Sequence, residues 1–217
     1  MPKIKPFDEH YKEYDKWFDE HPAIYESELN AIRAAIPKSG LGQAVEVGAG
    51  SGRFAVPLGI KLGVEPSYEM AKIARQRGME IVIGVAENLP LPSNSYDTVL
   101  FVTTICFVDD PMVSLREAHR VLRPRGRIII GFIDADSPIG RLYQEKKKSS
   151  VFYRHARFYT YSQVSDMLLS IGFKNLKVWQ TLFKPIEQVN AKEPVKKGFG
   201  AGSFLVIRAE KPAKGNS

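Results

Sequence analysis

The stretch VEVGAGSG, residues 45–52, places three glycines within five positions directly after a short apolar run. Glycines that follow a strand let a ligand approach the main chain closely and meet the free N–H groups of a helix start. The acidic Glu46 precedes the first of these glycines by two positions. A carboxylate at this point repels a pyrophosphate and attracts a positive charge. The stretch therefore favours a cationic, nucleoside-bearing ligand over a dinucleotide.

The spacing of the glycines also departs from the dinucleotide-binding fingerprint. Gly48, Gly50 and Gly52 give G-x-G-x-G, and Arg53 stands where the fingerprint has its last glycine. The next acid at the end of a predicted strand, Glu65, follows Gly52 by 13 positions, whereas the usual separation in dinucleotide folds is about 20. An NAD-linked oxidoreductase is therefore the disfavoured alternative.

Strand-like apolar runs alternate with helix-like segments through the first two thirds of the chain. The runs cover 43–48, 60–65, 80–84, 96–103 and 126–133. This alternation predicts an α/β fold with a mainly parallel, Rossmann-like sheet and helices on both faces. Two later runs, 173–183 and 203–211, have no helical pattern between them. We expect them to pair antiparallel at a sheet edge, which gives seven strands.

Capping residues mark the ends of three predicted helices. Ser67 is the expected cap of a helix to residue 77, Asp110 caps one that opens at Pro111, and Thr160 or Ser162 caps one that Gly172 ends.

The first crossover helix has no such pattern. Pro57 and Gly59 lie where it should run, so we expect a stub of one or two turns. The flank of the sheet beside it would be filled by the N-terminal segment or by a neighbouring chain in a homodimer.

These motifs resemble those of class I S-adenosylmethionine-dependent methyltransferases, in particular the small-molecule enzymes typified by ubiquinone and menaquinone biosynthesis. The likeness extends from about residue 40 to residue 133 and keeps the expected order. Its motifs are VEVGAGSG, GVEPS (63–67), GVAENLPLPSNSYDTVLF (84–101) and EAHRVLRPRGRIIIGF (117–132). The resemblance implies methyl transfer with S-adenosyl-L-methionine as the cofactor.

The resemblance also implies a set of cofactor-binding residues. The glycine loop would lie against the methionine and ribose of the cofactor, and Glu65 would accept hydrogen bonds from both ribose hydroxyls. Residues that follow the third and fourth strands would border the adenine and the methionine. The implied set is Glu46, Gly48, Ala49, Gly50, Gly52, Glu65, Pro66, Ser67, Ala86, Glu87, Thr103 and, from an N-terminal YDKWF motif, Tyr14.

Residues 1–40 have a helical pattern and many aromatic side chains, which leaves two interpretations. The rings cover one side of the core, or they form a lid that shuts water out of a ligand site. We expect a single methyltransferase domain over residues 1–217. It would comprise a helical lid (1–40), a cofactor-binding core (41–133) and substrate-side elements with the edge strands (134–217).

Charge is distributed unevenly along the chain. Residues 1–140 carry 16 Lys and Arg against 19 Asp and Glu, whereas residues 141–217 carry 15 against 5. The basic last third fits an acidic substrate, a nucleic acid or an anionic surface, or is an ordinary solvated face. The single cysteine, Cys106, excludes an internal disulfide and a multi-cysteine zinc site, and we expect no metal.

The sequence has no apolar window of about 18 residues, so it predicts no membrane span. Its first ten residues have no apolar signal region. A cytoplasmic location is therefore the expectation.

The methyl acceptor is expected to be a small molecule, with an anion as one candidate. Enzymes that methylate bases or glutamine carry an Asn/Asp-Pro-Pro-aromatic motif after the fourth strand, and VTTICF (102–107) stands here instead. Nucleic acid is therefore disfavoured as a partner. An RNA methyltransferase and a non-catalytic S-adenosylmethionine-binding module are the alternatives to a small-molecule enzyme.

A catalytic base is not evident from the sequence. The segment SVFYRHARFYTY (150–161) places His155 between two arginines and among several aromatic residues. His155 could act as a general base while Arg154 or Arg157 holds an anion, or the rings only anchor the loop. The substrate-side candidates are Thr104, Tyr153, His155 and Arg157.

Overall fold

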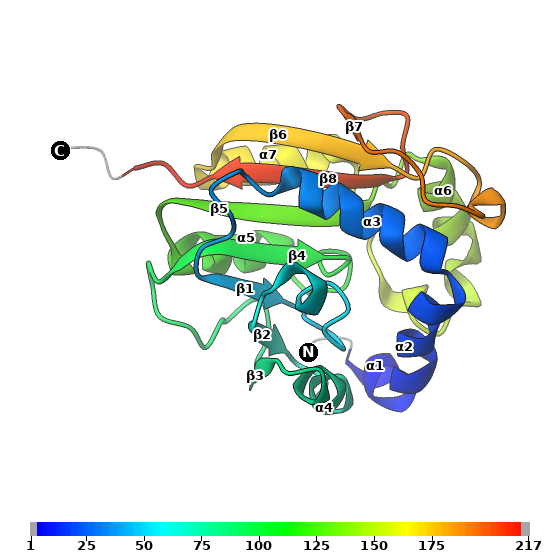
Figure 1. The fold of residues 1–217 in the computed structure, drawn as a ribbon, viewed down its shortest axis with the longest axis horizontal. Coiled ribbons are helices and arrows are strands. Elements are labelled where there is room, and N and C mark those ends of the chain that lie inside the picture. The colour runs from blue at the N-terminus through cyan, green and yellow to red at the C-terminus, as the bar shows by residue number, and fades with distance from the viewer. Residues whose placement is uncertain (1–3, 214–217) are drawn as a thin grey trace.

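One twisted sheet organises the chain (Figure 1). The computed structural model describes residues 4–213, and its strands within that range follow the order β3-β2-β1-β4-β5-β8-β6-β7. The first five strands pair in parallel, and the last three add antiparallel pairs. The strands are β1 Ala44–Val47, β2 Leu62–Glu65, β3 Glu80–Ile83, β4 Tyr96–Val102, β5 Leu122–Ile133, β6 Lys174–Thr181, β7 Lys196–Lys197 and β8 Phe204–Glu210.

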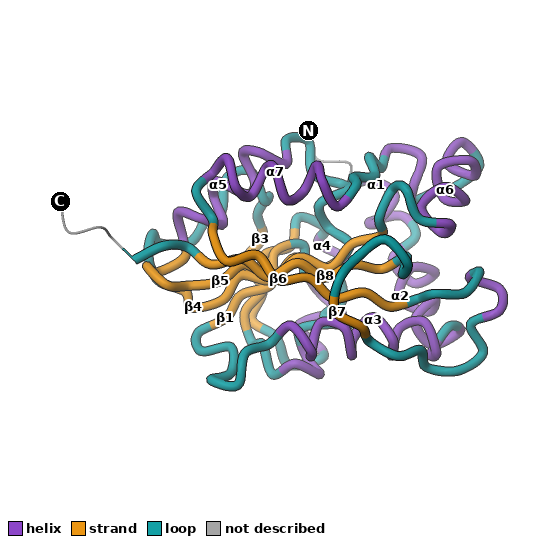
Figure 2. Tube along the Cα trace, turned by 90° about the horizontal axis from the view of Figure 1, so that it is seen from above, coloured by secondary structure: helices purple, strands orange, loops and turns teal. Residues whose placement is uncertain are grey.

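Helices cover both faces of the sheet, with α5 and α7 over one face and α3 over the other (Figure 2). The α-helices are α1 Lys5–Glu9, α2 Tyr11–Glu20, α3 Pro22–Ala35, α4 Tyr68–Gln76, α5 Pro111–Val121, α6 Pro138–Glu145 and α7 Tyr161–Ile171. Short 3₁₀ turns are η1 Val56–Leu58, η2 Lys146–Lys148, η3 Tyr153–His155 and η4 Ile186–Gln188.

Alternate residues of the central strands face the two layers of the core. In β4, Val99 and Phe101 pack with the α5 and α7 layer, whereas Leu100 and Val102 pack with the α3 layer. All four side chains are at most 4% exposed. Because both faces are buried, a shift of the register by one residue would exchange the two layers. The burial of both faces therefore fixes the register of the strands. The register in turn sets the positions of the loops at the strand ends.

The predicted helix caps are confirmed. The Ser67 side chain accepts a hydrogen bond from the Met70 N–H at the start of α4, and the Asp110 side chain accepts one from the Val113 N–H at the start of α5. Of the two caps left open for α7, Thr160 is the one used. It forms a capping box, in which each of two side chains satisfies a backbone N–H of the first turn.

The first crossover is the predicted stub, reduced to the 3₁₀ turn η1. The N-terminal helices cover this flank, since the rings of Phe18 and Tyr25 lie 5.8 and 5.5 Å from that of Phe54. At the other end of β1 and β2, a cleft of about 740 Å³ lies between residues 40–44, 58–62 and 92–96.

The structure differs from the sequence-based expectation in two elements. The sheet has an eighth strand, because Lys196–Lys197 pairs with Trp179 and Gln180 of β6. A two-residue strand leaves no periodicity in the sequence by which to find it. Helix α6 was also not expected, although Ser137 caps it and Pro138 occupies its first turn, a combination typical of helix starts.

Candidate functional site

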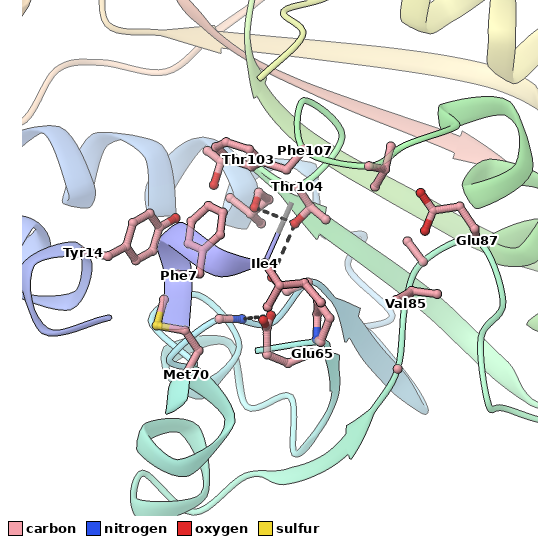
Figure 3. Close-up of a pocket in the computed structure, with 17 residues that line it drawn as sticks. Ile4, Phe7, Tyr14, Glu65, Met70, Val85, Glu87, Thr103, Thr104 and Phe107 are labelled. Carbon is pink, nitrogen blue, oxygen red and sulfur yellow. Dashed lines mark hydrogen bonds between the residues drawn. The ribbon is translucent and has the colours of Figure 1, made fainter. Parts of the chain in front are cut away.

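A cleft opens where the parallel strands end, beside helices α1 and α2 (Figure 3). Its cavity volume is about 90 Å³. The lining residues come from the loops after β1, β2, β3 and β4 and from the N-terminal helices. They are Ile4, Phe7, Tyr14, Gly48, Gly50, Glu65, Pro66, Met70, Gly84, Val85, Ala86, Glu87, Val102, Thr103, Thr104, Phe107 and Val108. The cleft lies at the carboxyl ends of the strands, where open α/β sheets bind ligands.

The glycine loop after β1 needs glycine for two different reasons. Gly48 has φ +69°, and a Cβ there would lie 2.3 Å from Thr104 Cγ2. Gly50 has φ +54°, and the nearest atom to a Cβ would be Met70 Cε at 3.7 Å. Gly48 therefore allows β4 to approach, whereas Gly50 leaves its side of the loop open toward the cleft.

Glu65 joins the end of β2 to this loop. Its Oε2 accepts a hydrogen bond from the Gly50 N–H and its Oε1 accepts one from the Ser67 N–H, both at 2.8 Å. Burial raises the pKa of Glu65 to about 7, although these two hydrogen bonds lower it. Each carboxylate oxygen can accept two hydrogen bonds, so each keeps one acceptor position for a ligand.

Thr103, at the end of β4, has a backbone conformation that is rare for its residue type. Its φ is +51°, and β-branched residues seldom occupy the left-handed region. The conformation is held by a 2.8 Å hydrogen bond from the Thr103 N–H to the Gly131 carbonyl. The Thr103 side chain also interacts with Tyr14. Burial raises the pKa of Tyr14, and this interaction lowers it in part. Strain of this kind is concentrated at functional sites.

Aromatic rings close the cleft on the side of the N-terminal helices. The Phe7 ring of α1 lies 5.3 Å from that of Tyr14 and 5.0 Å from that of Phe107. Beyond Phe107 the contacts continue to Tyr153, whose ring lies 6.0 Å away, and then to Tyr143, at 4.8 Å. These half-buried rings form a series of contacts from α1 to the segment 143–153.

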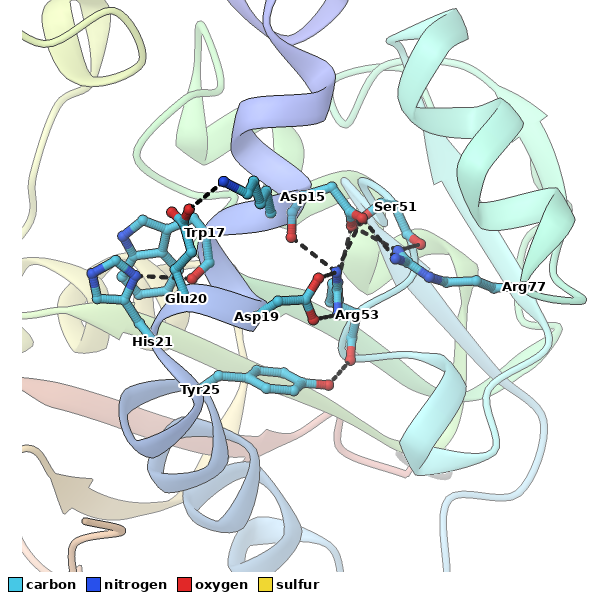
Figure 4. A network of polar contacts seen from close by, with 10 residues as sticks. Asp15, Trp17, Asp19, Glu20, His21, Tyr25, Ser51, Arg53 and Arg77 are labelled. Carbon is cyan, nitrogen blue, oxygen red and sulfur yellow. Dashed lines mark hydrogen bonds and ion pairs between the residues drawn. The ribbon is translucent and has the colours of Figure 1, made fainter. Parts of the chain in front are cut away.

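A polar network fixes helix α2 to the glycine loop (Figure 4). The Asp15 carboxylate accepts hydrogen bonds from Arg53 Nε at 2.9 Å, from Arg77 Nη2 at 2.7 Å and from the Ser51 hydroxyl. Burial raises the pKa of Asp15, but the two guanidinium groups outweigh it and hold the pKa well below its usual range. Asp19 adds an ion pair to Arg53 at 2.7 Å. The arginine that replaces the last glycine of the dinucleotide fingerprint therefore secures α2.

Most of the residues expected to bind the cofactor come together in the cleft. Those that line it are Tyr14, Gly48, Gly50, Glu65, Pro66, Ala86, Glu87 and Thr103. Ala49, Gly52 and Ser67 lie outside the lining, although Ser67 contacts Glu65 through its backbone.

Glu46 lies elsewhere than the sequence argument expected. Its side chain is 1% exposed and does not line the cleft. Burial raises the pKa of Glu46 well above its usual value, against an opposing interaction with the Ala55 backbone. Oε2 of this residue has no hydrogen-bond partner within residues 4–213. Of these two acids, Glu65 lines the cleft and Glu46 does not.

The substrate-side candidates separate into two groups. Thr104 lines the cleft, and Tyr153 lines a cavity of about 20 Å³ that shares Thr103 with it. His155 and Arg157 are exposed and line neither space. Arg157 lies over the Tyr159 ring, 5.3 Å from its centre. The structure therefore does not bring the proposed base and anion-binding arginine to the site.

Sequence reasoning missed several apolar lining residues. They are Ile4, Phe7, Met70, Gly84, Val85, Val102, Phe107 and Val108. Phe107 could have been found from the sequence, because it lies four positions after the end of the predicted strand 96–103. The others are ordinary core residues by sequence, and only the fold places them at the site.

Among the helices of residues 4–213, none has the length and apolar character to cross a membrane. The same residues contain no group of three His, Cys, Asp or Glu side chains arranged to hold a metal ion.

Comparison with known proteins agrees with this geometry. A family model described as a methyltransferase domain matches residues 45–130. The uncharacterized protein MJ1123 of Methanocaldococcus jannaschii is 48% identical over 205 residues, which are 94% of this chain and 98% of that protein. The demethylmenaquinone methyltransferase of Oceanobacillus iheyensis is 25% identical over 175 residues, which are 74% of this chain and 68% of that protein.

A solved structure is similar over almost the whole chain. It is a SAM-dependent methyltransferase from Thermotoga maritima, described as a possible histamine N-methyltransferase. It has 48% sequence identity and a TM-score of 0.92, and the match covers 96% of this chain and 99% of that one. The chain therefore belongs to the class I S-adenosylmethionine-dependent methyltransferases, and it is an enzyme whose cofactor is S-adenosyl-L-methionine.

Proposed function

We propose that the enzyme transfers the methyl group of S-adenosylmethionine to a small-molecule acceptor, which binds between Thr103 and the aromatic rings of the N-terminal helices. The observation that carries this proposal is that Phe7, Tyr14 and Phe107 line the cleft, with the Phe7 ring 5.3 Å from that of Tyr14 and 5.0 Å from that of Phe107. A cleft narrowed by these three rings fits a compact acceptor better than a polymer.

The residues of the cleft fit the cofactor. The Glu65 carboxylate keeps an acceptor position on each oxygen for the two ribose hydroxyls, since each oxygen accepts one backbone hydrogen bond. Gly50 leaves room beside the loop, because the nearest atom to a Cβ would be 3.7 Å away. Ala86 and Glu87 would border the adenine, and Thr103 and Tyr14 would border the methionine.

The cofactor supplies a methyl group that is already electrophilic, because it is bonded to a positively charged sulfur. The residues of this chain therefore need to bind the two molecules, orient them and exclude water. The glycine loop and Glu65 serve binding. Asp15, Arg53 and Arg77 hold α2, and with it Tyr14, over the site. No general base is required unless the acceptor must lose a proton.

The description of the Thermotoga maritima relative as a possible histamine N-methyltransferase also names a small molecule for that protein. The basic charge of residues 141–217 leaves RNA as the competing acceptor.

The test is incubation of the purified protein with methyl-labelled S-adenosylmethionine and a possible acceptor. One set of reactions contains a small-metabolite extract or histamine as a defined compound. The other set contains total RNA. We expect label in low-molecular-weight products and none in RNA. The matched control is Glu65→Gln, which should bind S-adenosylhomocysteine weakly and form little product. Label only in nuclease-sensitive material would contradict a small-molecule acceptor. Binding of S-adenosylhomocysteine without any labelled product would favour a non-catalytic module.

A further inference from the structure

A small cavity lies next to the main cleft, and Thr103 belongs to the wall of both. Its volume is about 20 Å³. The residues on its sheet side follow β4 or end β5, and they are Ile105, Cys106, Phe132 and Ile133. Of these, Ile105, Cys106 and Phe132 are at most 8% exposed. The cavity therefore lies against the packed end of the sheet and borders the cleft at Thr103.

The other side of the cavity belongs to the segment 153–159, which is fixed to the sheet side at two points. The Arg157 N–H donates a 2.7 Å hydrogen bond to the Cys106 carbonyl, and the Ala135 N–H donates a 3.0 Å hydrogen bond to the Tyr159 carbonyl. The side chains of this segment that line the cavity are Tyr153, Phe158 and Tyr159. The cavity therefore lies between two walls that backbone hydrogen bonds hold together.

The lining of the cavity is uncharged and mostly apolar. Every residue that lines it lies within the described part of the chain, and none is an Asp, Glu, Lys, Arg or His. The Cys106 sulfhydryl in its wall already donates a 3.2 Å hydrogen bond to the Thr103 carbonyl. A buried water needs about two to four polar partners, whereas apolar cavities stay dry and accept apolar guests. An uncharged, apolar group is therefore the fitting occupant.

The volume limits the size of that occupant. About 10–15 Å³ of free volume suffices for one water molecule. The volume of about 20 Å³ therefore admits a group of roughly one or two carbon atoms. A carboxylate or ammonium group of this size would lose its hydration in the cavity without meeting an ion-pair partner. The cavity therefore selects for a methyl or ethyl group.

The position of the cavity relates it to the methyl acceptor. Thr103, the residue proposed to border the methionine of the cofactor, lines both the cleft and the cavity. The Tyr153 ring in the cavity wall lies nearly parallel to the Phe107 ring in the cleft wall, with centres 6.0 Å apart. An acceptor between Thr103 and Phe107 therefore has the cavity beside it.

From this geometry we infer that the cavity is the subsite for a short apolar substituent of the methyl acceptor. The acceptor is then a molecule that carries an uncharged methyl or ethyl group close to the atom that is methylated. This inference rests on the proposed function and names the substrate class of the same site.

Xenon tests the cavity without knowledge of the acceptor, because it binds in apolar cavities. The full chain is labelled with ¹³C at the isoleucine δ1 methyl groups and titrated with xenon, and NMR spectra are recorded. We expect saturable shifts at Ile105 and Ile133 and none at Ile83 of β3, which is 46% exposed. Two wall methyl groups that do not respond to xenon would overturn the inference.

Filling the cavity tests its role in the reaction. Cys106→Val replaces the sulfhydryl by a methyl group and adds a second one. It should abolish the xenon response and lower the formation of labelled products from the small-metabolite extract at least tenfold. Binding of S-adenosylhomocysteine should stay within twofold, because Cys106 does not line the cleft. Product formation by Cys106→Val at the rate of the unmodified protein would refute the subsite.

A second variant at the same position separates filling from the loss of a hydrogen bond. Cys106→Ala also removes the bond to the Thr103 carbonyl, but it leaves the cavity open. It should therefore keep the xenon response and form at least fivefold more product than Cys106→Val. Equal loss of product in the two variants would assign the effect to the hydrogen bond and contradict the subsite.

Enlarging the cavity should change which acceptors react. Phe158 is a half-buried ring of the cavity wall. Phe158→Leu should extend the labelled products, identified by mass spectrometry, to acceptors whose alkyl groups are longer by at least one carbon. The matched control is Phe199→Leu, at a ring that is 52% exposed and outside the cavity lining, which should leave the set of products unchanged. The same set of products from Phe158→Leu would contradict selection by the size of this cavity.

The outcomes separate the two proposals. Small-molecule products that Cys106→Val forms as fast as the unmodified protein contradict the subsite alone. Label confined to RNA contradicts the proposed function, whatever the response of the cavity to xenon.

Discussion

The Glu65 carboxylate accepts a 2.8 Å hydrogen bond from the N–H of Gly50, so the end of the second strand holds the glycine loop of the first. A second hydrogen bond of the same length comes from the Ser67 N–H. The acid thus has two tasks, because it shapes the loop and offers its remaining acceptor positions to a ligand.

Replacing Glu65 by glutamine removes the charge but keeps the volume. We expect S-adenosylhomocysteine binding to weaken by about 1.5–3 kcal/mol, the scale of hydrogen bonds to a charged group. Isothermal titration calorimetry measures this directly. Glu69→Gln, at a surface ion pair with Lys72, serves as the control. Affinity unchanged by Glu65→Gln would remove Glu65 from the binding site.

Cofactor affinity should also depend on pH. Burial raises the pKa of Glu65 to about 7, so the carboxylate proposed to accept hydrogen bonds from the ribose hydroxyls prevails above this pH and is lost below it. We expect S-adenosylhomocysteine affinity to fall as the pH drops from 8 to 5, approaching tenfold per unit, since one proton is then displaced on binding. In the Glu65→Gln variant, S-adenosylhomocysteine affinity should no longer fall in this way. An equally steep fall in that variant would assign the pH dependence to another group.

Two glycines of the loop should respond differently to alanine. Gly48→Ala adds backbone strain and a contact 2.3 Å from Thr104 Cγ2, whereas Gly50→Ala adds strain with only an ordinary contact to Met70. We expect Gly50→Ala to lower the free energy of unfolding by about 1 kcal/mol and Gly48→Ala to lower it more. Urea denaturation measures these free energies. In the Gly48→Ala background, Thr104→Ala should restore part of the lost free energy of unfolding. Additive effects of the two substitutions would argue against a direct contact.

The Asp15 network predicts coupling between α2 and the cofactor site. Asp15 is 16% exposed and pairs with both Arg53 and Arg77. Asp15→Asn should lower the free energy of unfolding by about 2 kcal/mol, because it leaves two partly buried cations without their shared anion. It should also weaken S-adenosylhomocysteine binding. Asp19→Asn, at a side chain that is 64% exposed, should leave both nearly unchanged, and equal effects of the two variants would contradict a special role for Asp15.

Thr103 offers a test of stored strain. With φ at +51°, glycine fits this position better than alanine, since only glycine adopts the left-handed region without cost. We therefore expect Thr103→Gly to be more stable than Thr103→Ala by about 1 kcal/mol, while methyl transfer falls in both. Thermal unfolding and initial rates measure the two effects. The opposite order of stability would mean that the backbone relaxes in the variants.

Local signals in the sequence predicted much of this fold. Ser67, Asp110 and Thr160 each cap the expected helix because a cap depends on the few residues around it. The α6 helix had the same kind of signal at Ser137 and Pro138. The start of this helix is therefore also marked in the sequence.

Elements that depend on the whole fold could not be predicted in this way. Glu46 follows the alternation of β1, but in a strand buried on both faces this pattern does not say whether an acid reaches a ligand or lies beneath a turn. Its burial under the short crossover is a tertiary outcome. Glu28 of α3, which is 5% exposed, is by contrast a buried acid that a local pattern marks, because it lies four residues from both Ile24 and Ile32. This spacing already put it on the apolar face of its helix.

The contact between the N-terminal helices and the far side of the sheet affects how the chain acquires its shape. Arg208 of β8 donates a 2.7 Å hydrogen bond to the Ala35 carbonyl, at the end of α3 and 173 positions earlier in the chain. During synthesis α3 therefore leaves the ribosome long before the strand against which it packs, and its apolar face must wait, exposed or held by a chaperone, until the last strand arrives. Contacts this distant in sequence slow folding, so the packing of α3 against the sheet should form among the last features of the nascent enzyme.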